Sequence, residues 1–469
     1  MRWFKTWNRR LQSILAFSLL STYVLSFLFE GQILYSLLAI NGISASGYIA
    51  LAIAAHFLGL FTSGLFIRST SQARLLMCCG LSAALLSIIP FLFAPSFLWQ
   101  MGLFIGGYGS GAAIAAWGYF LKSFTEKKDR LKTCADVLII SNILMVIINI
   151  ISIQSTPVIG IVMVMLAMTL AMALIWGLKE NLESQKQEQG QPKVTSDLFK
   201  AVILLCLFIA VLTINSGLMY VVINPAFQHL TKLVSWYWAV PYLVVLVVMR
   251  RLPREFKLSK MLYAGMAMMV SAFIAIMLLG RNSWDYLVVD TLLLGACGIF
   301  DLFWWSILGD ILDYTDNPSL IFGVGLSANV LGVLAGGLIG TAAKSTQVLT
   351  AEITVMGLTV VCITLAMLPV LNRHLVNLLK THQYLIAYDI MDQNQQSAIL
   401  YQAAALEPLT SREQEVLQEL LLGKSNREIA AALYITENTV KTHAKNIYSK
   451  YDVRSRAELI STILKESDS

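Results

Sequence analysis

Twelve stretches of this chain, each about twenty residues long, consist almost entirely of apolar side chains. A stretch of that length crosses a bilayer as an α-helix, because a helix satisfies all of its backbone hydrogen bonds internally. Charged residues make up only 13% of the 469 residues, about half of their usual share in a soluble protein. We therefore expect an all-α, twelve-helix membrane domain over residues 1–371. The apolar stretches lie near residues 11–34, 47–67, 74–94, 97–121, 134–153, 157–177, 198–222, 233–250, 261–280, 285–309, 320–343 and 350–371.

Lysine and arginine are distributed unevenly over the segments that connect these stretches. With the amino terminus inside the cell, the inner segments contain 22 of these residues and the outer segments contain three. Such an excess marks the cytoplasmic side, and an even number of spans returns the chain to the side where it started. Both termini are thus predicted to be cytoplasmic, with the spans in the inner membrane of a bacterium. The first apolar stretch is too long for a cleaved signal peptide, so we expect it to remain as the first span.

A polar segment from Lys179 to Lys200 separates the twelve predicted spans into two groups of six, over about residues 11–177 and 198–371. Two six-helix halves around a longer cytoplasmic loop resemble the major facilitator superfamily of membrane transporters. Transporters of that family have a Gly-x-x-x-Asp-Arg-x-Gly-Arg signature after the second span. Here the chain reads GLFIRSTSQ from Gly64 to Gln72, without the acidic residue or the second glycine. The resemblance predicts the fold of the family, and the altered signature weakens the prediction of transport.

Charged side chains at membrane depth are costly, so each one is a candidate functional residue. Asp290 and Asp301 lie eleven residues apart in the tenth span, about three helical turns, and so share a helix face with Leu294, Cys297 and Trp304. The resemblance implies that the first, fourth, seventh and tenth spans surround a central cavity. The further candidates for that cavity are Glu30, Asn215, Tyr108 and Trp117.

No lysine or arginine lies deep within a predicted span. A cavity that contains these acids therefore favours a cationic or hydrogen-bonding ligand, or a proton. The alternative is purely structural: Asp290 and Glu30 lie at the outer membrane interface, and Asp301 belongs to an internal hydrogen-bond network.

Other patterns in the spans favour packing over chemistry. Glycines recur at four-residue intervals from Gly332 to Gly340 and again between Gly102 and Gly111, which lets neighbouring helices approach closely. The six cysteines lack metal-ligand spacing and predict apolar packing without disulfides. The aromatic residues from Trp236 to Tyr242, at the start of the eighth span, predict a belt at the membrane interface.

Residues 372–408 are too polar to cross a membrane. Their apolar residues recur at three- and four-residue steps from Leu375 to Ile390, which is the pattern of an amphipathic helix. Two interpretations stay open for this linker: a helix on the membrane surface, and a helix that pairs with a second copy.

The chain from Leu409 to Ser469 predicts a separate domain of four short helices. Capping boxes, in which a hydroxyl residue precedes glutamate by three positions, begin three of them at Thr410, Ser425 and Ser455. Thr436 caps the other, which runs to about Lys450 and follows a tight turn, as in a helix-turn-helix. The inward faces supply a small apolar core. Its predicted members are Val416, Leu417, Leu420, Ile429, Ala430, Leu433, Ile435, Val440, Ile447 and Val453.

Three residues near the start of the 437–450 helix, Lys441, Thr442 and Lys445, are predicted to point outward, where a helix that enters the major groove of DNA contacts bases and phosphates. The domain closely resembles the LuxR-type DNA-binding domain. The resemblance rests on LTSREQEVL from Leu409, GKSNREIA from Gly423 and TVKTH from Thr439, with Tyr451-Asp452 in place of the usual Leu-Gly. It implies that Lys441, Thr442 and Lys445 contact DNA, that Thr439 and Asn426 position the DNA backbone, and that the last helix pairs two domains as a homodimer.

Together these parts predict a membrane-embedded, one-component transcriptional regulator that senses a small molecule and binds double-stranded DNA. Two alternatives stay open: a secondary transporter with a regulatory DNA-binding tail, and a membrane tether for DNA without signal input. The five histidines are scattered and no Ser/His/Asp pattern occurs, so we expect neither an enzyme nor a cofactor.

Overall fold

The computed structural model describes residues 8–29, 31–178, 195–219, 227–252, 258–315, 317–345, 352, 354–371, 408–422, 424, 426–453 and 456–465. These residues form helices and connecting turns, with no strand among them. Glu30, most of the Lys179–Lys200 segment and nearly all of the predicted 372–408 helix lie outside the described residues. The chain divides into two units, one that contains most of the large helical bundle and one that contains the carboxy-terminal helices.

Ten helices of the described part are long and apolar enough to cross a membrane. The fourth and eighth predicted spans are the two outside this group. The fourth corresponds to the 28-residue, glycine-rich helix α5. The eighth is divided into α10 and α11 at Trp238, and Pro241, which lacks a backbone N–H to donate, lies in the first turn of α11.

The first half of the bundle contains a π-helix, η2, and two short 3-10 turns, η3 (Ile89–Leu92) and η4, between its α-helices. The π-helix extends α1 from Val24 to Phe29, where the regular backbone pattern widens. The bounds of this half are α1 Arg9–Tyr23, η2 Val24–Phe29, α2 Gln32–Ile40, α3 Ala45–Ser63, α4 Thr70–Ile88, α5 Phe97–Phe124, η4 Lys127–Asp129, α6 Arg130–Gln154 and α7 Pro157–Gly177.

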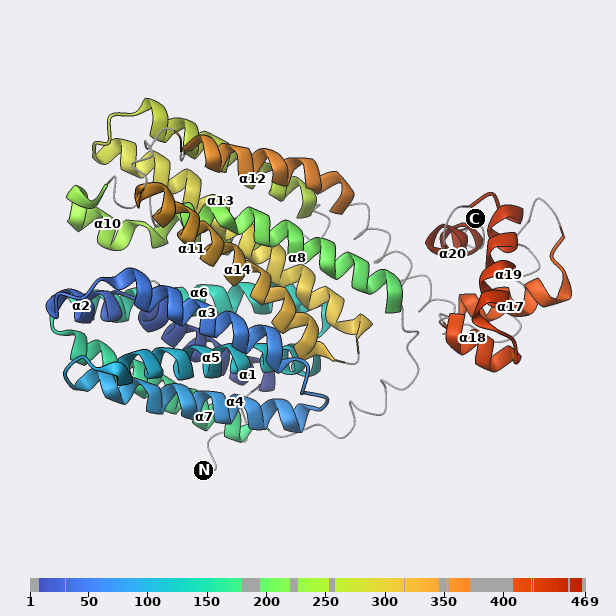
Figure 1. The fold of residues 1–469 in the computed structure, drawn as a ribbon, viewed down its shortest axis with the longest axis horizontal. Coiled ribbons are helices and arrows are strands. Elements are labelled where there is room, and N and C mark those ends of the chain that lie inside the picture. Colours follow the sequence, from blue (N-terminus) through green and yellow to red (C-terminus); the bar gives the residue numbers. More distant parts are fainter. Residues whose placement is uncertain are drawn as a thin grey trace. The chain divides into compact units, whose positions relative to one another are not determined.

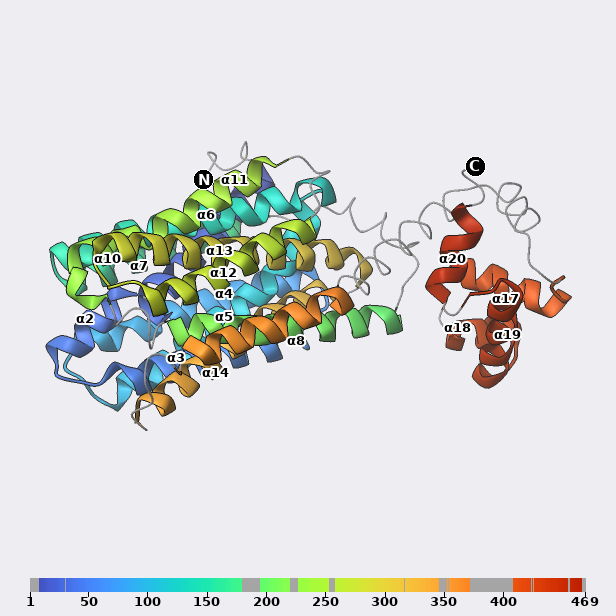
Figure 2. The ribbon, with the colours of Figure 1, turned by 90° about the horizontal axis from the view of Figure 1, so that it is seen from above.

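The second half repeats this all-helical organisation. Its bounds are α8 Thr195–Leu218, α10 Thr231–Tyr237, α11 Ala239–Arg251, α12 Leu258–Leu278, α13 Ser283–Ile311, η7 Leu312–Tyr314, α14 Pro318–Ser345 and a last helix over Thr354–Leu371. Figure 1 shows the first half, in blue to teal, beside the second half, in green to orange, and Figure 2 shows the same helices from above, where the two halves overlap. The halves meet where α14 packs on α3 and α5, and where α11 and α13 pack on α6.

Glycines allow the closest helix approaches, as their spacing predicts. A Cβ atom added to Gly111 of α5 would lie 2.4 Å from the carbonyl oxygen of His56 on α3. One added to Gly336 of α14 would lie 2.1 Å from the carbonyl oxygen of Ile214 on α8. No side chain fits in either place, so these glycines set the distance between the helices. All six cysteines are free.

The carboxy-terminal helices surround an apolar core of their own. They are α17 Ser411–Leu421, α18 Asn426–Leu433, α19 Glu437–Lys450 and α20 Arg456–Lys465. All ten predicted core residues belong to this cluster, most of them buried and Leu433, Ile435 and Val453 packed at its edge. The predicted capping box is present at Thr410 and Glu413, and Thr436 caps α19. Ser425 and Ser455 lie outside the described residues.

Candidate functional site

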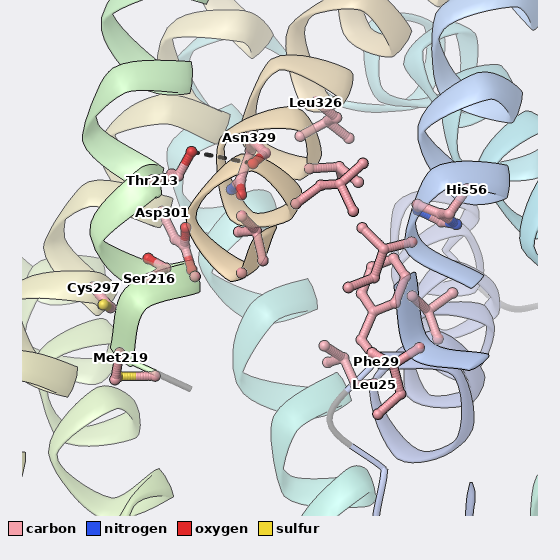
Figure 3. Close-up of a pocket in the computed structure, with 18 of the residues that line it drawn as sticks. Leu25, Phe29, His56, Thr213, Ser216, Met219, Cys297, Asp301, Leu326 and Asn329 are labelled. Atoms are coloured by element: carbon pink, nitrogen blue, oxygen red, sulfur yellow. Dashed lines mark hydrogen bonds between the residues drawn. The ribbon is translucent and has the colours of Figure 1, made fainter. Parts of the chain in front are cut away.

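A cavity of about 780 Å³ lies between the two halves of the bundle. This volume is in the range of small-molecule sites. Residues of η2, α3 and α6 line it from the first half, and residues of α8, α11, α13 and α14 line it from the second. Most of these side chains are apolar, and a few polar groups lie among them, several of which appear in Figure 3.

Asp301 is the predicted ligand residue that lines this cavity. The hydroxyl of Tyr242 on α11 donates a hydrogen bond of 2.8 Å to its Oδ2, and the side chain of Asn329 on α14 is a second hydrogen-bond partner. Thr213 on α8 in turn donates to the backbone oxygen of Asn329 at 3.1 Å. Figure 3 shows Asp301, Thr213 and Asn329 grouped on one wall. Two neighbouring helices of the second half, α11 and α14, thus contact the Asp301 carboxylate, and α8 supports Asn329 from behind.

His56 lies on the opposite wall, on α3 of the first half (Figure 3). Its Nδ1 is 3.0 Å from the Oγ of Ser110 on α5, and the Ser110 hydroxyl donates to the backbone oxygen of Gly107 at 2.9 Å. The ring of Phe29, at the end of η2, packs edge-on against the imidazole. The histidine is therefore fixed in orientation by hydrogen bonding and by packing.

Only part of the helix face predicted on the tenth span lines the cavity. Leu294, Cys297 and Asp301 line the cavity, and Trp305 continues this face in place of Trp304. Trp304 is buried away from it, at 1% exposure. Asp290 is also buried but does not line the cavity, and it hydrogen-bonds with Tyr286.

Three further candidates lie elsewhere in the bundle. Asn215 is fully buried and points its Nδ2 toward the sulfur of Met269, 3.5 Å away. Trp117 donates a hydrogen bond of 2.9 Å to the Oγ of Ser13. Tyr108 faces outward from α5, 38% exposed, in a groove beside α3. The fourth span contributes Ile114 to the cavity instead, and the second and eleventh spans contribute much more than predicted.

The predicted aromatic belt is wrong for two of its members. Trp238 and Tyr242 line the cavity, and Tyr242 holds the Asp301 carboxylate. Trp236, by contrast, is 47% exposed on the bundle surface, as a belt residue would be. The sequence of an aromatic cluster at a helix start does not show which rings turn inward.

Polar contacts join the two halves at the end of the bundle where α6 begins. Arg130 on α6 donates to the Asp313 carboxylate on η7 at 2.6 Å and to the backbone oxygen of Gly309 at 2.8 Å. Arg250 on α11 forms a two-pronged ion pair with Asp136 on α6. Arg130 and Leu138, the first cavity residue along α6, are separated by about two helical turns. These ion pairs link α6 of the first half to α11 and η7 of the second.

In the carboxy-terminal unit, α19 presents an exposed polar stripe. Lys441, Thr442 and Lys445 are exposed, as predicted, and Asn438 extends the same stripe one turn toward the start of the helix. Asn438 was missed in the sequence, although its spacing of three, four and seven residues from the other members identifies it. Its backbone oxygen accepts a hydrogen bond of 3.0 Å from the Thr442 hydroxyl.

The two predicted positioning residues, Thr439 and Asn426, are half-buried. The hydroxyl of Thr439 is 2.7 Å from that of Thr436, the residue that caps α19. Asn426 is the first residue of α18. Both therefore lie at helix starts, where backbone N–H groups favour a phosphate.

An ion pair ties the end of α19 to the start of α17. Lys450 Nζ lies 2.7 Å from Glu413 Oε2, and it also donates to the backbone oxygen of Pro408 at 2.9 Å. Burial alone would raise the pKa of Glu413, but the hydrogen bonds from Lys450 and Thr410 outweigh it and hold the pKa below its usual value. This pair fixes the orientation of α19 within the unit.

The same carboxy-terminal residues match a known family. Residues 407–463 match the family of bacterial regulatory proteins of the luxR type. Over 50 residues the chain is 56% identical to the uncharacterized transcriptional regulatory protein YhcZ of Bacillus subtilis, which covers 11% of this chain and 23% of that protein. Over 53 residues it is 51% identical to the CsgBAC operon transcriptional regulatory protein of Escherichia coli, 11% of this chain and 24% of that protein. The chain thus spans about a quarter of these relatives.

The bundle has a structural relative of another kind. The crystal structure of the human organic anion transporter MFSD10 (TETRAN) superposes with a TM-score of 0.57, covering 77% of this chain and 98% of that one, at 12% sequence identity. The apolar helices and this structural match define a multi-pass membrane protein with the major facilitator fold. More particularly, this fold is joined in one chain to a LuxR-type helix-turn-helix domain of the kind found in transcriptional regulators.

Proposed function

We propose that this protein is a membrane-embedded, one-component transcriptional regulator. Its bundle binds a small molecule in the cavity between the halves, and its carboxy-terminal domain binds double-stranded DNA. The observation that carries the proposal is the exposed stripe of α19, from Asn438 to Lys445, in a chain whose bundle also contains a cavity of ligand size. Relatives of this domain are regulators, which supports the assignment to transcription.

The arrangement in the cell follows from charge. The end of the bundle that contains Arg130 and Arg250 is rich in basic residues, so it faces the cytoplasm by the positive-inside rule. Both termini then lie in the cytoplasm of a bacterium, where α19 can reach the chromosome. A homodimer formed through the carboxy-terminal domain matches the two half-sites that such regulators usually bind.

Ligand binding changes DNA binding only if the ligand prefers one arrangement of the two halves. The cavity has walls from both halves, so a bound molecule contacts both and acts on their relative position. The chain between residues 372 and 408 connects the bundle to the DNA-binding domain and carries that change.

Genome-wide mapping of DNA crosslinked to the full-length protein tests the regulator. We expect discrete promoter sites that disappear in a Lys441→Ala/Lys445→Ala double variant that is still inserted in the membrane. Lys424→Ala is the matched control, because Lys424 lies between α17 and α18 and pairs with Glu419. An identical DNA profile in the double variant would contradict the proposal.

Transport with a regulatory tail is the second candidate. The ion pairs that join the halves at one end of the cavity favour it, because a transporter must open and close such contacts. Membrane vesicles distinguish the two functions. Substrate uptake that depends on a proton gradient and is lost in Asp301→Asn would support transport, whereas binding without uptake supports the sensor.

A further inference from the structure

We propose that the cavity takes a monovalent organic cation with an apolar body of aromatic size, and that Asp301 is its counter-charge. This inference rests on the proposed function, since it names the class of molecule that the bundle would sense. The charge, the polar contacts and the shape of the cavity support it.

The charged side chains that line the cavity favour a cation. Among the described residues that line the cavity, Asp301 is the one carboxylate, and no lysine or arginine lines it. A carboxylate at membrane depth normally has a cationic partner, because its charge is otherwise poorly solvated. His56 is the one basic side chain among the described residues that line the cavity, and its hydrogen bond goes to Ser110 and not to Asp301. A ligand with one positive charge supplies what is missing, whereas an anion would be repelled.

The polar contacts of Asp301 also favour a cation. Tyr242 and Asn329 hold the carboxylate from two different helices, so its position is fixed before a ligand binds. Two hydrogen-bond donors cannot neutralise the charge, so a cation can still bind beside them. A permanent charge such as a quaternary ammonium group would need no hydrogen bond and would rely on the charge alone.

The surrounding side chains favour a cation as well. Phe300 and Trp305, on the same helix as Asp301, line the cavity, and the Tyr242 ring lies on the adjoining helix. Trp305 is held by edge-on contacts with Phe17 and Phe322 at 5.8 and 5.6 Å between ring centres. Aromatic rings beside a carboxylate are the surroundings that bind ammonium groups by cation–π attraction. The volume of about 780 Å³ and the mostly apolar walls accommodate a hydrophobic body attached to that charge.

Binding to the full-length protein in detergent tests this inference with a matched pair of probes. Benzyltrimethylammonium has a permanent positive charge, and neopentylbenzene has the same shape with carbon in place of nitrogen. Tetraphenylphosphonium serves as a larger cation and benzenesulfonate as an anion. Quenching of tryptophan fluorescence reports binding, because Trp305 and Trp238 line the cavity.

We expect saturable binding of at least one cation, weakened at least tenfold by Asp301→Asn and restored in part by Asp301→Glu. Asp290→Asn is the matched control, since Asp290 is a buried acid of the same helix that does not line the cavity. Melting temperatures of all variants show whether they are folded. The inference is overturned if neither cation binds, if Asp301→Asn binds the cation as tightly as the natural protein, or if the neutral probe or the anion competes equally well.

Failure of this inference differs from failure of the proposed function. If the protein occupies promoters but binds neither cation, the proposed regulatory function stands and the proposed class of ligand is wrong. If the protein binds the cation through Asp301 but shows no promoter site in the mapping experiment, the proposed class of ligand stands and the proposed regulatory function is wrong.

Discussion

Arg130 on α6 donates a hydrogen bond to the Asp313 carboxylate on η7, and this contact of 2.6 Å joins the first half of the bundle to the second. Arg130 is 4% exposed, so the pair is largely shielded from solvent. Removing one partner of a buried pair costs more than removing a surface pair, because the other charge is left without compensation. The contact is therefore a strong point of closure between the halves.

Asp313→Asn should loosen this end of the bundle. Cys134, fully buried one turn along α6 from Arg130 with its sulfur 3.7 Å from the backbone oxygen of Trp305, reports the change. With Cys134 as the single remaining cysteine, a membrane-permeant maleimide should label the variant several times faster than the natural protein. Glu126→Gln is the control, because the ion pair of Glu126 with Lys128 is exposed. Equal labelling of all three proteins would rule out a closing role for Arg130 and Asp313.

Gly336→Ala should lower the melting temperature of the full-length protein in detergent by several degrees. The new methyl group would lie 2.1 Å from the backbone oxygen of Ile214, and overpacking of this kind costs about 1–3 kcal/mol. The neighbouring Gly337 offers a matched control, since a Cβ atom there meets nothing within 4 Å. Gly337→Ala should melt like the natural protein, and a loss of stability of the same size in both variants would refute the packing argument.

Acid should destabilise the carboxy-terminal domain partly through Glu413. Its pKa is lower in the folded state than in the unfolded state, so its contribution is present above the unfolded pKa of about 4.3 and is lost as the pH falls through the folded value. Glu413→Gln removes this contribution and should cost about 1–2 kcal/mol at pH 7, typical of a charge-assisted hydrogen bond. Urea unfolding of residues 405–469 from pH 7 to pH 3 measures both. The free energies of unfolding of the two proteins should converge in acid, and parallel curves would contradict the assignment.

Lys441→Ala and Lys445→Ala should each weaken DNA binding by about 1–3 kcal/mol. If the lysine contacts a phosphate, its loss also reduces the slope of log affinity against log salt by about one. Titrations at several salt concentrations, with a promoter fragment and a random fragment, separate base contacts from phosphate contacts. Lys424→Ala should leave both the salt slope and the affinity unchanged. The same result for Lys441→Ala would contradict the prediction that α19 binds in the DNA groove.

Asp452→Gly should stabilise the carboxy-terminal domain by about 0.5 kcal/mol. Asp452 has a φ of 49°, in the left-handed region that glycine adopts without cost, and its negative charge follows the carboxyl end of α19. Asp452→Asn tolerates the same backbone and removes only the charge, so its stability should fall between the two. A glycine variant that unfolds at lower urea than the natural domain would show that the backbone there is not strained.

The sequence was most informative where local rules decide the structure. The capping box of Thr410 and Glu413 and the stripe of α19 depend on residues three and four positions apart, and both are present. The resemblance to LuxR-type domains also accounts for the positive φ of Asp452, because the family usually has glycine there.

In the bundle, the helices were predictable but the faces they turn toward the cavity were not. Lipid and protein interior are both apolar, so hydropathy does not mark the inner face of a membrane helix. Asn215 therefore gave no sign that it points toward Met269, and Tyr242 none that it reaches Asp301. Asp301 could be found because an acid within an apolar helix is itself the signal.

Asp301 and His56 stand on opposite walls of the cavity and belong to different halves of the protein. Under the proposed function, a ligand wide enough to contact both residues would set the distance between the two halves. A narrow ligand would draw the two halves together, and a wide ligand would hold them apart. Under the same proposal, two ligands with the same charge but different widths would have opposite effects on DNA binding.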